Sequence, residues 1–154
     1  MCGSSSDVRK RASGFTMIEL ITIIIILGIL AAVAIPRMNT SDFRAAEFHD
    51  KTVAALRHAQ KTATSHRRQV CAAFTASTVT LTIDTDNNAA CDTALLIPGA
   101  QNNSVVSGDA TNAIFNPVPT AFNFLSDGTT ATDKNLAIAG QTPILVVGAT
   151  GHVQ

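Results

Sequence analysis

The stretch that decides the fold is "RKRASGFTMIELITIIIILGILAAVAIPR", residues 9–37. Residues 15–35 hold one charged side chain, Glu19. As a helix they would be about 31 Å long, which matches the roughly 30 Å hydrocarbon core of a bilayer. Three basic residues, at positions 9–11, come before this run. Because positive charges stay on the cytoplasmic side, the pattern predicts one membrane span with its N-terminus inside and an exported C-terminal domain.

The carboxylate of Glu19 needs a reason, because an acidic group inside a membrane span is costly. An ordinary signal peptide is one alternative, since Ala32 and Ala34 form a small-residue pair suited to signal peptidase, but the apolar run exceeds the usual 7–15 residues or so. If cleavage instead falls after Gly14, the new amine at Phe15 lies one helical turn from Glu19. Each group then offers the opposite charge that the other needs, within one chain or between neighbours.

The residues "GFTMIEL", after a short basic leader, resemble the signature of type IV prepilins. This family includes type IV pilins and the pseudopilins of type II secretion. The resemblance implies that a prepilin peptidase cuts between Gly14 and Phe15 and methylates the Phe15 amine. It also implies that Glu19 aids docking into a filament. Gly28 and Pro36 match the two positions at which the helix of many pilins can loosen.

The resemblance implies an α+β fold, with a long N-terminal helix and a small antiparallel β head. The expected parts are a leader that is removed (1–14), a transmembrane and assembly helix (15–36), an amphipathic second half of the helix (37–68) and a β-rich head (69–154). The expected partners are other pilins and prepilin peptidase. The expected location is the bacterial inner membrane, with a periplasmic head, and then a pilus or pseudopilus.

Residues 39–69 are predicted to form the second helix, because small or apolar residues recur there at three- and four-residue spacing. This face comprises Phe48, Thr52, Ala55, Leu56, Ala59 and Ala63. Basic residues gather in the C-terminal half of the same helix, where they favour the helix dipole. They form either a solvated face or a patch for DNA or an acidic partner; they are Arg57, Lys61, Arg67 and Arg68.

The remainder is predicted to be a mainly antiparallel sheet that lies on the second helix. Strands are expected at 70–74 and 78–83, paired as a hairpin, and then at 94–97, 121–125, 135–139, 143–147 and 152–154. Turns are expected at "SDG" (126–128) and "GATG" (148–151).

Three stretches of the chain, 55–74, 122–128 and 144–153, also resemble the GspH/FimT group of minor pilins and pseudopilins. Members of this group are low-abundance subunits near a filament tip that help start assembly. Some FimT-like pilins bind DNA through an arginine-rich C-terminal region. Residues 148–154 contain no arginine, so DNA binding would depend on the basic residues of the second helix.

The chain has three cysteines, of which Cys2 lies in the leader and would be lost with it. Cys71 and Cys91 remain as an even pair in an exported domain, so a disulfide between them is expected. Two free thiols or a redox role are the alternatives.

The sequence offers no catalytic constellation. Asp84, Asp86 and Asn88 have the first spacings of an EF-hand, but Ala89 and Leu95 stand where glycine and glutamate are required. A polar loop is expected there, and a calcium site of another kind stays open. The histidines show no metal-ligand spacing, and no phosphate loop or nucleophile motif occurs. We therefore expect no enzyme activity, cofactor or metal; the histidines are His49, His58, His66 and His152.

Overall fold

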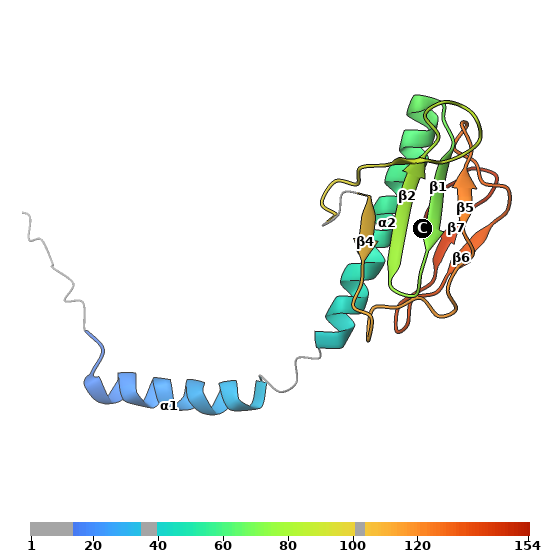
Figure 1. Cartoon of the computed structure of the whole chain (residues 1–154). Helices are drawn as coiled ribbons and strands as arrows, with labels where there is room; N and C mark the ends of the chain where they lie inside the picture. The colour runs from blue at the N-terminus through green and yellow to red at the C-terminus, as the bar shows by residue number, and fades with distance from the viewer. Residues whose placement is uncertain (1–13, 35–39, 101–103) are drawn as a thin grey trace, which may run out of the picture. The chain divides into compact units, whose positions relative to one another are not determined.

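The computed structural model of the chain describes residues 14–34, 40–100 and 104–154 (Figure 1). It divides into two units, residues 1–39 and 40–154, and each is described by itself. The expectations for the leader up to residue 13 and for Pro36 lie outside the described residues, as does the junction between the two predicted helix halves.

The first unit contains α1, Met17–Ala34, within the predicted helix. Apolar residues occur all around α1, so it has no polar face of the kind that a surface helix of a globular protein shows. The helix continues through Gly28 without interruption. Over the residues that the structure describes, no helix reaches the length and hydropathy that crossing a membrane requires.

The second unit begins with α2, Thr40–His66, which confirms the predicted second helix. The predicted face is buried, with Phe48 2% exposed and Leu56 0% exposed. The helix ends because Arg67 adopts a left-handed backbone, with φ of 52°. The N–H of Arg68 then donates to the carbonyl of Ala63 at 3.1 Å, the closing bond of a Schellman motif.

The main sheet is antiparallel throughout, and its centre is the predicted hairpin. β1, Val70–Phe74, pairs with β2, Thr78–Ile83, along its whole length. β5, Phe122–Phe124, lies on the other side of β1. Two short strands, β3, Thr93–Ala94, and β4, Val105–Ser107, both pair with β2. The order is therefore β3-β2-β1-β5, with β4 beside β2.

A second, two-stranded sheet is formed by β6, Lys134–Leu136, and β7, Ile144–Val146. Val153 bridges Val146, where the last short strand was predicted. The predicted strand 94–97 is wrong beyond Ala94. Pro98 comes directly after the predicted strand and cannot donate a ladder hydrogen bond. Ile97 is buried, whereas Leu96 is 64% exposed.

The core lies between α2 and the main sheet, against which α2 packs (Figure 1). Aromatic rings connect the layers: Phe48 of α2 meets Phe115 edge to face, with centroids 5.1 Å apart. Phe74 of β1 contacts Phe115 at 5.5 Å and stacks on Phe122 of β5 at 5.6 Å. Such pairs add about 0.5–1.5 kcal/mol each beyond burial of their area. Helix followed by antiparallel sheet is the α+β fold that was expected.

Candidate functional site

The predicted cleavage point lies in non-helical backbone immediately before α1. Phe15 is 76% exposed, and a Cβ placed on Gly14 would have no atom within 4 Å. An open, non-helical peptide bond is what a peptidase requires, because its backbone must enter an active site. The structure therefore leaves the Gly14–Phe15 bond accessible within the described residues.

Glu19 occupies the third position of α1, and Thr16 is the residue that caps the helix. The backbone N–H of Glu19 donates to the Thr16 hydroxyl at 3.3 Å and to the Thr16 carbonyl at 3.1 Å. Thr16-x-x-Glu19 has the spacing of a capping box, with the carboxylate near the positive end of the helix. Sequence reasoning missed Thr16, although this spacing could have revealed it. The exposed side chain of Glu19 is open to a neighbouring molecule.

The three stretches that resemble the GspH/FimT group meet at one place in the head. Gln60 of α2 donates from Nε2 to the carbonyl of Thr150 at 2.7 Å. Gly128, in the turn after β5, packs against Gly151, in the turn after β7. A Cβ on Gly151 would stand 1.8 Å from the carbonyl oxygen of Gly128. Both glycines have positive φ, 86° and 65°, so each turn needs a residue without a side chain there.

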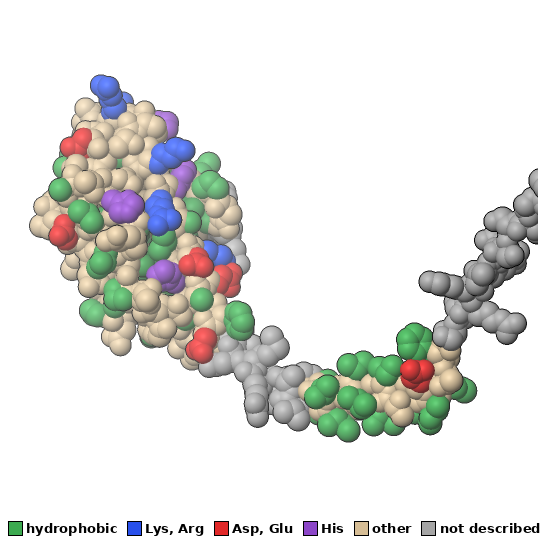
Figure 2. Space-filling view, turned by 180° about the vertical axis from the view of Figure 1, so that it is seen from behind, with side chains coloured by type: hydrophobic (Ala, Val, Ile, Leu, Met, Phe, Trp, Pro, Cys, Tyr) green, Lys and Arg blue, Asp and Glu red, His purple; other side chains and the backbone are tan. Residues whose placement is uncertain are grey.

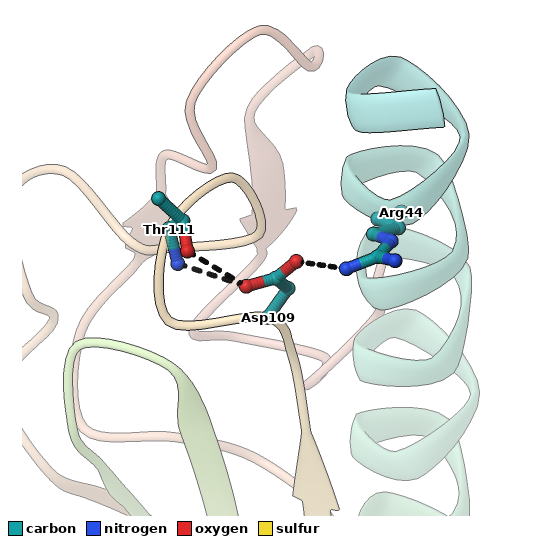
Figure 3. Close-up of polar contacts among 3 residues, drawn as sticks. All are labelled: Arg44, Asp109 and Thr111. Atoms are coloured by element: carbon teal, nitrogen blue, oxygen red, sulfur yellow. Dashed lines mark hydrogen bonds and ion pairs between the residues drawn. The ribbon is translucent and has the colours of Figure 1, made fainter. Parts of the chain in front are cut away.

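A second junction ties the start of α2 to the loop after β4 (Figure 3). The carboxylate of Asp109 accepts hydrogen bonds from the backbone N–H and the hydroxyl of Thr111, both at 3.0 Å. Its other oxygen accepts from Nη1 of Arg44. The bond from the Thr111 backbone, together with the Arg44 side chain, lowers the pKa of Asp109 from 3.8 to about 2. Asp109 is therefore a carboxylate at neutral pH.

The loop that follows β2 is joined to β1 by a disulfide between Cys71 and Cys91, whose Cα atoms are 6.0 Å apart. Within this loop, Asp84 is only 2% exposed. Its two oxygens accept from the backbone N–H groups of Asn87 and Ala89, at 2.7 and 2.9 Å. Burial alone would raise the pKa of Asp84, but these hydrogen bonds outweigh it and lower that pKa. Both carboxylate oxygens of Asp84 thus accept hydrogen bonds from the backbone of the loop itself.

The four basic residues predicted on the second helix differ in their surroundings, and two of them, Arg67 and Arg68, follow the end of α2. Arg57 donates from Nε and Nη2 to the carbonyl of Val153, at 3.2 and 3.1 Å, and so fastens the last strand-like segment to α2. Arg68 is half-buried, whereas Lys61 and Arg67 are exposed. Lys61 and Arg67 are the better placed to meet a partner, because the exposed Arg57 already bonds to Val153.

The side chains of two of the four histidines have a polar partner within the described residues. Nδ1 of His49 lies 3.2 Å from the carboxylate of Asp50, and Nε2 of His58 lies 3.1 Å from the carbonyl of Leu96. Among the described residues, no three His, Cys, Asp or Glu side chains are placed to hold a metal ion together.

The fold and the N-terminal segment together define a type IV pilin-like chain, with an N-terminal helix followed by an antiparallel sheet. Residues 9–35 match the prokaryotic N-terminal methylation motif. This match supports a type IV prepilin N-terminus at these residues. The chain is also 47% identical over 55 residues to the type IV narrow pilus major component PilA5 of Thermus thermophilus.

The alignment with PilA5 covers 35% of this chain and 47% of that protein, so the chain spans about half the length of this relative. No solved structure matches the chain.

Proposed function

We propose that the chain is a structural subunit of a type IV pilus or of a type II secretion pseudopilus. In this role prepilin peptidase cleaves it between Gly14 and Phe15 and methylates the Phe15 amine, and α1 then packs among the helices of neighbouring subunits. The observation that carries the proposal is Glu19 within an apolar helix that directly follows the basic leader. The methylation motif at residues 9–35 and the accessible Gly14–Phe15 bond support it.

The proposal places the unassembled chain in the bacterial inner membrane. Residues 15–36 would form the transmembrane and assembly helix, with the leader in the cytoplasm and the head in the periplasm. The basic leader and the apolar sequence that follows it support this orientation. The role is structural, and the chain would be the substrate of prepilin peptidase rather than an enzyme.

The test is intact-mass and N-terminal analysis of the protein from its native membranes. A chain that begins at Phe15 and is heavier by one methyl group supports the proposal. A chain that begins at Ile35 would mean ordinary signal-peptidase cleavage after Ala34 and a secreted head, and would overturn it. A chain that keeps Met1 would also overturn it.

The assembly role of Glu19 has a separate test. Glu19→Ala should leave cleavage largely intact but lower incorporation into filaments, because the Phe15 amine of the neighbour loses its carboxylate. Glu19→Gln is the matched control for shape, and it should behave like Glu19→Ala if the negative charge is what matters. Normal incorporation of both variants would remove this role.

Within this function we propose a minor, low-copy subunit of the GspH/FimT type that helps to start the filament. The junction of Gln60, Gly128 and Gly151 supports this, because it joins the three stretches that resemble that group. Quantitative mass spectrometry of sheared filaments tests the proposal. An abundance equal to that of the principal subunit would overturn the minor role and leave the pilin assignment intact.

DNA capture is the alternative function that the exposed Lys61 and Arg67 would serve. Arg57 is less suited to it, because its guanidinium is bonded to the Val153 carbonyl. Binding through so few phosphate contacts would be weak already at low salt and weaker still as the salt concentration rises. A gel-shift assay at low salt that shows no binding would exclude this alternative.

A further inference from the structure

The outer face of α2 carries a single exposed stripe of side chains. Its members follow one another alternately at four and three positions, a spacing that keeps them on one side of the helix. We call it the α2 stripe; its residues are Phe43, Glu47, Asp50, Ala54, Arg57, Lys61 and Thr64, all exposed. Along the helix the stripe changes from aromatic to acidic, then to a small residue, and then to basic.

The two charged halves of the α2 stripe are separated in space. Figure 2 views this side of the head, where acidic side chains gather at the lower right and most Lys and Arg side chains lie above them. Glu47 already pairs with Lys51 within α2, at 2.6 Å. Within the described residues, Asp50 forms an ion pair with the neighbouring His49 alone, at 3.2 Å, and its side chain is 84% exposed. Asp50 and Lys61 are therefore the opposite charges best placed to meet another molecule.

One displacement along the helix brings complementary residues together. Lys61 lies eleven positions after Asp50, and Ala54 lies eleven positions after Phe43. Eleven residues make about three turns and a rise of about 16.5 Å, so two parallel stripes shifted by this amount still face each other. The shift sets Asp50 of one chain opposite Lys61 of the other, and Phe43 opposite Ala54.

Ala54 adjoins an apolar cavity that fits this arrangement. The cavity has a volume of about 190 Å³ and lies between α2 and β4; its lining includes Ala54, His58, Ile97, Pro98 and Val105. A cavity of about 150 Å³ admits a benzene ring, so this one has room for a phenylalanine side chain. Phe43 is 68% exposed, and an aromatic ring at the end of a helix face is costly to leave in water.

We propose that the α2 stripe is a contact surface for a second copy of this chain, parallel to the first and displaced by eleven residues. Phe43 of one copy enters the cavity beside Ala54 of the other, and Asp50 of the first meets Lys61 of the second. The inference rests on the proposed function, because identical subunits that follow one another in a filament have the same orientation along its axis. The contact is heterologous, so it can repeat along a filament, and a low-copy subunit uses it wherever two copies are consecutive.

Cysteine cross-linking in the full-length chain tests this register. Two differently tagged copies are co-expressed, one with Asp50→Cys and the other with Lys61→Cys, and oxidised in membranes and in filaments. We expect an interchain disulfide in the mixture, identified by peptide mass, because a disulfide requires Cα atoms within about 7 Å. Each variant alone should give none. The matched control replaces Lys61→Cys by Asp133→Cys, which lies outside α2, and it should not cross-link.

Charge reversal tests the chemistry of the same contact. With the cross-linking pair moved to Phe43→Cys and Ala54→Cys, Asp50→Lys in the first copy should lower the yield roughly twofold to fivefold, the effect of one exposed charge pair. Lys61→Asp in the second copy should restore it. Failure of this rescue would overturn the pairing.

Three other outcomes also contradict the proposal. A self-cross-link of Ala54→Cys alone would indicate instead that the two Ala54 positions face each other, either in parallel register or in an antiparallel, two-fold pairing. A chain that is cleaved at Phe15 and recovered from filaments, yet gives no Asp50–Lys61 cross-link, overturns this contact while the proposed function stands. A chain that is not cleaved at Phe15 overturns the proposed function and this inference together.

Discussion

Gly151 lies against the backbone of Gly128 so closely that a Cβ on Gly151 would stand 1.8 Å from the Gly128 carbonyl oxygen. The contact joins the turn after β7 to the turn after β5, and Gln60 and Arg57 of α2 bond to the same region. A backbone-to-backbone contact of this kind cannot be relieved by a side-chain rotation. The last segment of the head can therefore lie against the turn after β5 only because residue 151 has no side chain.

Gly151→Ala is accordingly expected to destabilise the head by about 3 kcal/mol or more, because it adds a backbone clash to the strain of positive φ. Gly140→Ala is the matched control. Gly140 also has positive φ, 76°, but a Cβ there would meet nothing within 4 Å, so its cost should be about 1 kcal/mol. Urea unfolding of both variants in detergent measures the difference. Equal losses would mean that the Gly128 contact contributes nothing.

The second prediction concerns acid stability and follows from Asp109. Its pKa of about 2 in the folded chain lies below the ordinary 3.8, so its interactions stabilise the fold at pH values above about 4. That contribution is lost as the pH falls through about 2, where folded and unfolded chains are both protonated. Asp109→Asn should therefore lower the melting temperature at pH 6 and make little difference near pH 2.

The control for Asp109→Asn is Asp92→Asn, which removes the same charge from an exposed side chain. Melting curves of the three proteins at pH 6, 4 and 2 make the comparison. A constant difference between Asp109→Asn and the parent chain across this range would show that ionisation of Asp109 is not linked to folding.

Local patterns predicted the elements that are long or regular. The hairpin of β1 and β2 was correct to the residue because β2 is rich in β-branched residues and a three-residue connection separates the two strands. The buried face of α2 was correct because its spacing is helical. β4 was missed because only Val105 and Val106 mark it, and its pairing with β2 comes from the tertiary fold.

The contacts that hold the head together could not be predicted in the same way. Arg44 and Asp109 are 65 positions apart, and Arg57 and Val153 are 96 apart. Neither pair has a local signature, because each depends on how α2 lies against loops that follow much later in the chain. The glycine contact at Gly151 is of the same kind: the sequence indicated a turn there but not what the turn would touch.

The third prediction concerns the disulfide between Cys71 and Cys91. Protein isolated from its native membranes should give a peptide pair linked by these cysteines under non-reducing conditions. The Cys71→Ser, Cys91→Ser double variant should lose about 3 kcal/mol of stability, because the bond closes a loop of 20 residues. The parent chain under reducing conditions should unfold at the same urea concentration as this variant. Two free thiols in the native protein would contradict the pairing.

The fourth prediction is a stabilising substitution at Thr52, in the middle of the buried face of α2. Thr52 is 0% exposed, and among the described residues its hydroxyl has no hydrogen-bond partner. Thr52→Val replaces this hydroxyl by a methyl group of similar size and keeps the β-branch, so it should raise the free energy of unfolding by about 1 kcal/mol. Thr64→Val is the matched control in the same helix, since the Thr64 hydroxyl is exposed and donates to the Lys61 carbonyl at 2.9 Å. That variant should leave stability unchanged or slightly lower. If Thr52→Val destabilises the protein by as much as a lost hydrogen bond would, the Thr52 hydroxyl has a partner, and a water bound beside α2 becomes the explanation.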